Sequence, residues 1–310
     1  MSTLISRPAT EDDLSIVKEI VDSNLLSLNP REKRIGDSEA LNFIRGFVDP
    51  AITRLTKFSK EEDWKSFITL NPDASRNRFY LDVYTRPGAS TLHDSFELAI
   101  QLARETNPDF QLWLGVQSND LEYKNLLHQK GFDLLRRYWT LEMELPSNLK
   151  PRLPVGLIRE IDPTIESEMR SFHAVNQDSF SKHFGFMPRA YEEWRELVLR
   201  DREEVNLRVW LISLDGEDVG FLDCSDELIH EDAGYVAGLG VRLAFHGRGL
   251  GESLLNHAIQ TYSALGRKKL CLNVDAGNES GALRLYEKVG MKPFSEWHQY
   301  ENVNWSSQTA

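Results

Sequence analysis

Residues 234–291 read GYVAGLGVRLAFHGRGLGESLLNHAIQTYSALGRKKLCLNVDAGNESGALRLYEKVGM, and the rest of the chain can be interpreted from this stretch. The short apolar run 235–241, interrupted by glycines, predicts a buried strand. The loop HGRGLG at 246–251 follows it and leads into apolar residues at helical spacing. A second strand is expected at 270–274, and then a helix that ends at Gly290. This order places several free backbone N–H groups at a helix N-terminus, where an anionic phosphate group binds well.

The composition indicates a globular protein of one large domain or two ordinary ones. The chain has 310 residues, of which 41% are hydrophobic and 27% are charged. The net charge of −12 disfavours broad nucleic-acid binding and mildly favours a cationic substrate such as an amine. Because no leader-like stretch or apolar run near 18 residues occurs, we expect no membrane association and a cytoplasmic location. Cys224 and Cys271 lie among strand-like residues, so we expect both to be buried free thiols.

The chain repeats itself. Ile5-Ser6-Arg7 precedes an acidic helix start, and Leu157-Ile158-Arg159 does so again in the second half. Between them, residues 146–154 contain three prolines and show no periodicity, as a linker does. We therefore predict a first domain at 1–145 and a second domain at 155–310.

Matching residues extend the repeat deep into both halves. Asn119 and Asn278 each precede an apolar helix, and Gly131 and Gly290 each close one. Both pairs are 159 positions apart (278 − 119 and 290 − 131). Two copies of one fold explain this regular offset.

The two halves differ where chemistry is expected. The first half has no glycines where Gly247, Gly249 and Gly251 stand in the second, and side chains there would crowd out a phosphate. Leu127 occupies the place of Tyr286, so a hydrocarbon replaces a hydroxyl. We expect the first domain to be a structural copy that binds no cofactor.

A dinucleotide-binding loop is the main alternative for the glycine-rich turn. That motif requires G-x-G-x-x-G after a strand. Counted from Gly247 the third glycine would be Glu252, and counted from Gly249 it would be Leu254, so neither register fits. The loop is therefore interpreted as a binding site for a different pyrophosphate group.

Two segments, VRLAFHGRGLG at 241–251 and NESGALRLYEKVGM at 278–291, resemble the acetyl-CoA signature of the GCN5-related N-acetyltransferase (GNAT) family. That family's loop reads Gln/Arg-x-x-Gly-x-Gly/Ala, and its later helix carries Asn-x-x-x-Ala-x-x-Leu-Tyr. Here His246 stands first in the loop and Met291 replaces the family's closing phenylalanine. The match covers about residues 155–303, and residues 3–145 in outline. Two such domains, the first degenerate, resemble the mycothiol-synthase-like group of tandem acetyltransferases.

This resemblance implies a fold and an activity. Each domain is expected to be α/β, of the α+β type, with a central mixed and mostly antiparallel sheet flanked by helices. The second domain is expected to transfer an acetyl group from acetyl-CoA to the primary amine of a small molecule or peptide, by direct attack in a ternary complex. The alternative is a non-catalytic acyl-CoA-binding or regulatory module. The first domain would replace a second subunit, so we expect a monomer.

The resemblance also assigns residues to acetyl-CoA. Tyr286 would be the general acid that protonates the departing thiolate, although a tyrosine on an apolar helix face is otherwise a core residue. Asn278 is either a helix cap or a contact to the cofactor arm. The expected cofactor-binding residues are Leu239, Val241, His246, Gly247, Arg248, Gly249, Leu250, Gly251, Glu252, Asn278 and Tyr286.

The general base and the acceptor pocket are less closely defined by the sequence. An acidic side chain near the motif strand is needed to take the amine proton, and Asp223 and Asp232 are the candidates. The segment expected to cover the acceptor supplies Asp178, Phe180, His183 and Phe184 as substrate-binding candidates. No HExxH or CxxC spacing occurs, so no metal site is predicted.

Overall fold

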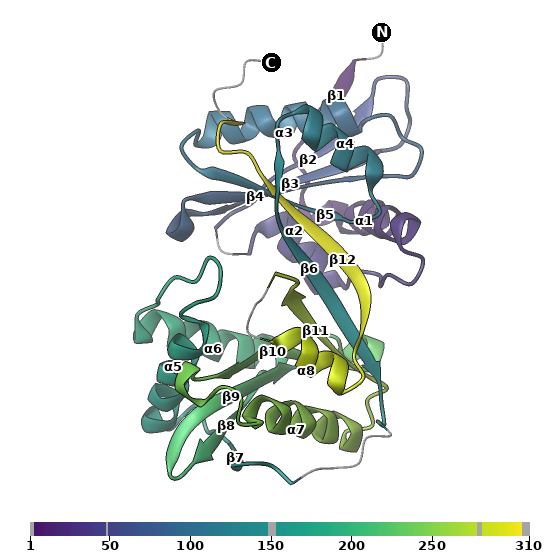
Figure 1. Ribbon diagram of the computed structural model, residues 1–310. Coiled ribbons are helices and arrows are strands. Elements are labelled where there is room, and N and C mark those ends of the chain that lie inside the picture. Colours follow the sequence, from purple (N-terminus) through teal and green to yellow (C-terminus); the bar gives the residue numbers. More distant parts are fainter. Residues whose placement is uncertain (1–2, 48, 148–152, 278–280, 306–310) are drawn as a thin grey trace. The chain divides into compact units, whose positions relative to one another are not determined.

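The computed structural model describes residues 3–47, 49–147, 153–277 and 281–305, and the chain divides into two compact units (Figure 1). Unit 1 consists of Met1–Tyr138 together with Ser295–Ala310, and unit 2 consists of Trp139–Phe294. Each unit contains a mixed sheet flanked by helices, which confirms the predicted fold class.

Unit 1 has the strand order β1-β2-β3-β4-β5-β12. Only the β4–β5 pair is parallel, and the other pairs are antiparallel. The elements are β1 (Leu4–Arg7), α1 (Leu14–Leu28), α2 (Asp37–Arg45), β2 (Ile52–Phe58), β3 (Ser66–Asp73), β4 (Arg78–Thr85), α3 (Leu92–Thr106), β5 (Gln111–Gln117), α4 (Leu121–Gln129) and β12 (Lys292–Glu301).

Unit 2 repeats this arrangement with the strand order β6-β11-β10-β9-β8-β7. The pair β10–β11 is parallel, and the pairs β9–β10, β8–β9 and β7–β8 are antiparallel. The elements are β6 (Asp133–Glu144), β7 (Leu157–Glu160), α5 (Glu166–Phe180), α6 (Tyr191–Val205), β8 (Arg208–Leu214), β9 (Glu217–Ser225), β10 (Ala233–Val241), α7 (Leu250–Ala264), β11 (Lys269–Asp275) and α8 (Ala282–Lys288).

The last strand of each unit comes from the other half of the sequence. β12, near the end of the chain, pairs with β5 of unit 1 through Trp297–Glu301. β6 lies beside β11, and its residues from Trp139 onward belong to unit 2, while those up to Tyr138 belong to unit 1. The proline-containing stretch 146–154 connects β6 to β7, which both belong to the sheet of unit 2. The compact units therefore differ from the division 1–145 and 155–310, because two strands are exchanged.

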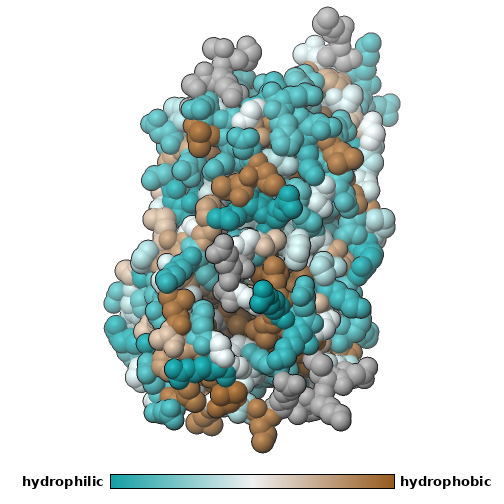
Figure 2. All heavy atoms as spheres, in the orientation of Figure 1, coloured by the Kyte–Doolittle hydropathy of each residue, from teal (hydrophilic) through white to brown (hydrophobic). Residues whose placement is uncertain are grey.

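Helices cover both faces of each sheet. In unit 2, α7 and α8 pack on one face with residues such as Leu222, Val236 and Leu254, while α5 and α6 pack on the other face around Phe172 and Phe221. Cys224 and Cys271 are buried free thiols, as expected. The face shown in Figure 2 is mainly hydrophilic, with hydrophobic residues in separate patches. Among the described residues, no helix combines the length and apolar character needed to cross a bilayer.

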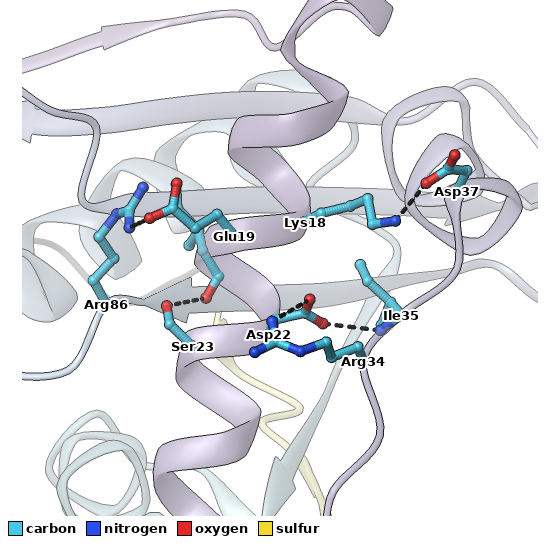
Figure 3. Close-up of polar contacts among 9 residues, drawn as sticks. Lys18, Glu19, Asp22, Ser23, Arg34, Ile35, Asp37 and Arg86 are labelled. Atoms are coloured by element: carbon cyan, nitrogen blue, oxygen red, sulfur yellow. Dashed lines mark hydrogen bonds and ion pairs between the residues drawn. The ribbon is translucent and has the colours of Figure 1, made fainter. Parts of the chain in front are cut away.

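A buried carboxylate on α1 fixes the chain that follows this helix (Figure 3). Asp22 is 5% exposed, and its carboxylate accepts hydrogen bonds from the Ile35 backbone N–H at 2.9 Å and from Arg34 at 3.3 Å. Lys18 pairs with Asp37 farther along the same segment. These contacts anchor the connection between α1 and α2.

We expect Asp22→Ala to lower the free energy of unfolding by about 1–3 kcal/mol, because the buried N–H of Ile35 loses its acceptor. Urea denaturation of the full-length chain measures this change. Asp37→Ala, which removes only an exposed partner of Lys18, is the control and is expected to cost less than about 1 kcal/mol. Equal losses in the two variants would contradict the anchoring role of Asp22.

Candidate active site

The strands β10 and β11 stop pairing before either of them ends. Their parallel register runs from Ala233↔Lys269 to Val236↔Leu272, whereas β10 continues to Val241 and β11 to Asp275. The register of β10 with β9 also shifts between Val236 and Gly238. Such a bulge bends a strand. The backbone of β10 beyond Val236 is therefore not paired with β11, and this unpaired region is called here the β10/β11 gap.

The glycine loop, residues 246–251, joins the end of β10 to α7. Gly247 and Gly249 have φ values of 75° and 80°, a left-handed conformation that glycine adopts without steric cost. The backbone N–H groups of residues 247–251 have no hydrogen-bond acceptor within the described part of the chain. Together with the dipole of α7, they form a site suited to a pyrophosphate group.

His246 and Arg248 complete the loop. Nε2 of His246 lies 2.8 Å from the carbonyl oxygen of Val241, so the imidazole fastens the loop to the end of β10. The guanidinium of Arg248 lies over the ring of Phe245, 4.9 Å from its centre. A cationic side chain is thus held beside the N–H groups that the sequence assigned to phosphate.

Close packing holds α8 against the first turn of α7. A Cβ atom on Gly251 would lie 3.2 Å from the side chain of Leu285, so any larger residue would push this side chain back. Lys288 also donates to Glu252 at 2.6 Å. These contacts fix Tyr286, which lies between Leu285 and Lys288 on α8, relative to the glycine loop.

Tyr286 is a buried phenol. It is 7% exposed and belongs to the apolar cluster that contains Val236, Leu250 and Leu272. Burial raises its pKa to about 12. The hydroxyl therefore stays protonated at neutral pH and is available as a proton donor.

Asp223 is a buried carboxyl group on the opposite face of the same sheet. It lies on β9 opposite Gly238 of β10, and its Oδ1 is buried without a hydrogen-bond partner. A Cβ atom at Gly238 would lie 2.3 Å from this oxygen, so the glycine makes room for the carboxyl group. Burial raises the pKa of Asp223 to about 7, a value well matched to a general base at neutral pH.

Asp232, the other candidate base, lies at the far end of β10. Along an extended strand it is about 20 Å from Gly238. Its carboxylate is paired with Lys268 at 2.6 Å, and this contact lowers its pKa. The structure therefore places Asp223 at the gap, and Asp232 away from it.

The acceptor candidates lie at the end of α5 and in the turn that follows. The ring of Phe180 packs 5.6 Å from that of Phe221 and 4.6 Å from that of His183, centre to centre. Phe184 is 45% exposed. Asp178, on the last turn of α5, accepts hydrogen bonds from Ser181 through its backbone carbonyl. Phe180 thus lies on the same face of the sheet as Asp223.

His183 links this segment to the loop side of the gap. Partial burial lowers its pKa, and the charges of Asp275 and His246 also act on it. Asp275 ends β11 and His246 begins the glycine loop, so His183 lies at the open end of the gap.

Residues 169–291 match the family model described as "Acetyltransferase (GNAT) family". These residues form a GNAT domain. A curated relative, the uncharacterized N-acetyltransferase YdgE of Bacillus subtilis, is 27% identical over 144 residues, which are 42% of this chain and 89% of the relative. The protein is thus an acetyltransferase, and acyl transfer is its class of reaction.

Two solved structures share the fold of almost the whole chain. A GCN5-related N-acetyltransferase from Sphaerobacter thermophilus has a TM-score of 0.77 at 19% identity and covers 96% of this chain and 95% of its own. A tandem GNAT protein from the clavulanic acid biosynthesis pathway has a TM-score of 0.73 at 15% identity, with 97% and 98% covered. The two-unit fold of this chain therefore occurs in other GNAT proteins.

Two residues that the sequence did not indicate lie beside β10 in the GNAT domain. A Cβ atom on Gly240 would lie 2.5 Å from the ring of Phe221 and 2.7 Å from Ser179, so both residues adjoin β10 on the face of Asp223. Their signal is the alternation of β9, where Phe221 and Asp223 are two positions apart. Leu239 and Val241 pack on the opposite face, and Asn278 lies outside the described residues.

Unit 1 lacks the corresponding features of the GNAT domain. Thr91 takes the place of Gly249, 158 positions earlier (249 − 91). It is fully buried, and its hydroxyl lies 2.6 Å from that of Ser66. Leu127, in the place of Tyr286, is also fully buried in the core. Side chains therefore occupy both positions where the GNAT domain has its loop and its phenol.

Proposed function

We propose that unit 2 transfers an acetyl group from acetyl-CoA to the primary amine of a small molecule or peptide, by direct attack. The observation that carries this proposal is the buried carboxyl of Asp223 beside Gly238, at the edge of the gap between β10 and β11. A base at this position can act on a nucleophile that approaches from the side of α5. Donor and acceptor would then meet within the sheet.

The glycine loop supports binding of the acetyl donor. The N–H groups of residues 247–251 and the dipole of α7 would hold the pyrophosphate of coenzyme A. Leu239 and Val241 would border the pantetheine arm with the backbone of β10. The resulting position of the thioester lies between the face of Asp223 and the face of Tyr286.

The proton transfers follow from these positions. Asp223 takes a proton from the acceptor nitrogen while this nitrogen forms a bond to the acetyl carbonyl carbon. The bond between that carbon and sulfur then breaks, and Tyr286 gives its phenolic proton to the thiolate. The products are an amide and coenzyme A, and both side chains regain their starting states by exchange with solvent.

We expect the chain to release free thiol from acetyl-CoA in the presence of at least one member of a panel of primary amines. A colorimetric thiol assay, with mass spectrometry of the acetylated amine, measures this activity. A non-catalytic acyl-CoA-binding module would bind the cofactor and release no amine-dependent thiol. That outcome, with saturating acetyl-CoA and every amine tested, would contradict acetyl transfer to an amine.

We expect Gly249→Val to weaken acetyl-CoA binding by roughly 10- to 100-fold or more, because a β-branched residue is strained at a φ of 80°. Calorimetric titration with acetyl-CoA measures the affinity. The matched control is Thr91→Val at the corresponding position of unit 1, which should leave the affinity unchanged. Equal losses in both variants would show that unit 1 also contributes a cofactor site.

A further inference from the structure

Unit 1 contains a cavity of about 390 Å³ on the face of its sheet opposite α3 and α4. Five aromatic side chains line it, together with polar side chains that include Asn71, Asp73 and Asp82. The aromatic residues are Phe47, Tyr80, Trp113, Tyr138 and Trp297. All of these residues belong to unit 1. The cavity is therefore a feature of the unit that lacks the glycine loop.

Strand register explains why these side chains converge. Asn71 of β3 lies opposite Tyr80 of β4, and Tyr80 lies opposite Trp113 of β5, so the three side chains share one face. On β12, Gln299 lies opposite Gly115, and Trp297 is on the same face. A Cβ atom at Gly115 would meet only Trp297, at 4.0 Å, so the glycine leaves open space in the floor of the cavity.

The cavity contains several polar atoms that have no hydrogen-bond donor among the described residues. Asp82 has no hydrogen bond or ion pair within the described residues. Burial raises its pKa to about 7, and no cationic neighbour opposes this shift. Asn71 is 4% exposed, and its amide donates to Thr69 at 3.0 Å while its Oδ1 is buried without a partner. Nδ1 of His298 is also buried without a partner.

A cation with N–H groups satisfies all of these features. An ammonium group donates to a carboxylate and an amide oxygen, and aromatic ring faces attract it. The aromatic walls also suit an apolar body attached to that ammonium. The guanidinium of Arg78 lies over the Trp113 ring, 3.6 Å from its centre, so this ring already attracts a cation. Among the described residues, no ion pair joins Arg78 to Asp82.

We propose that this cavity is a binding site for a small organic ammonium ion with an aromatic or apolar body, held by Asp82 and Asn71 between the ring faces of unit 1. The site is separate from acyl transfer in unit 2. Val83 and Val241 end corresponding strands of the two halves and are 158 positions apart (241 − 83), and at this offset Asp82 stands where unit 2 has Gly240. Asp82, which binds the ligand in unit 1, thus replaces Gly240, a glycine of unit 2 that leaves room beside the β10/β11 gap.

Calorimetric titration with phenethylamine tests the proposal, and 3-phenylpropionate serves as an anionic ligand of similar size. Titrations use the full-length Asp223→Asn variant, to disable the proposed base of unit 2, and the wild type. We expect saturable binding of phenethylamine and none of 3-phenylpropionate. Asp82→Asn should weaken phenethylamine binding roughly 10- to 100-fold in both backgrounds, because it removes the charge and preserves the shape.

A second variant distinguishes loss of the binding site from loss of folding. Gly115→Val is expected to fill the floor of the cavity without backbone strain, and so to block phenethylamine binding while thermal unfolding stays cooperative. Amine-dependent thiol release by the Asp82→Asn variant should equal that of the wild type. The proposal is overturned if phenethylamine does not bind, if binding survives both changes, or if 3-phenylpropionate binds equally well. Absence of amine-dependent thiol release by the wild type, with phenethylamine binding intact, would count against the proposed function alone.

Discussion

Replacement of Tyr286 by phenylalanine is expected to lower kcat for acetyl transfer by roughly 100- to 10,000-fold, while acetyl-CoA still binds. The ring packs in the apolar cluster of unit 2, and phenylalanine preserves that packing. Only the buried hydroxyl is lost, and with it the proton donor for the thiolate. Thiol release gives kcat, and calorimetry gives the affinity for acetyl-CoA.

Tyr300→Phe is the matched control for this change. Tyr300 is 1% exposed and lies in the core of unit 1, so the substitution again removes one buried phenolic oxygen. Its kcat should equal that of the wild type. An unchanged kcat in Tyr286→Phe as well would show that the thiolate is protonated by solvent or by another group.

Asp223→Asn is expected to lower kcat/KM by roughly 100- to 10,000-fold and to remove one limb of its pH profile. The base acts in its ionised form, and the pKa of Asp223 is raised by burial to about 7. In the wild type, kcat/KM should therefore fall as the pH drops below about 7. The variant should show no such limb, because asparagine does not titrate.

Asp232→Asn is the control for the base assignment. Asp232 is exposed and paired with Lys268, at the other end of β10, so its replacement should leave both kcat/KM and the pH limb in place.

Thermal unfolding of Asp223→Asn at pH 8 adds a test independent of activity. Ionisation of an unpaired buried carboxyl destabilises the folded state above its raised pKa, so the variant should unfold at the same or a higher temperature. A pH limb that persists in Asp223→Asn would exclude Asp223 as the base.

The sequence predicted the repeat, the glycine loop and the helix of Tyr286, because these depend on local signals. Glycine at a left-handed position and apolar residues at helical spacing are visible in a few residues of sequence. The same signals could not separate Asp223 from Asp232, since both lie near the motif strand. The register of β9 with β10 separates them, and register is a property of two strands.

The exchange of strands could not be predicted from the sequence, for a related reason. β6 follows α4 just as β12 follows α8, so either strand could be expected to complete the sheet nearest to it in the chain. The cavity of unit 1 was missed as well. It consists of alternate residues on β3, β4, β5 and β12, and β12 lies far from the others in sequence.

The exchanged strands also determine the order in which the two units can finish folding during synthesis. Unit 1 receives β12 only after all of unit 2 has been translated, so β5 remains an open edge of its sheet until then. An uncovered edge is prone to pair with other chains, and contacts of such long sequence separation form slowly. If translation stalls after the first half, the nascent chain therefore has a sheet with an aggregation-prone edge. Pairing of β12 with β5 is the step that protects unit 1 from aggregation.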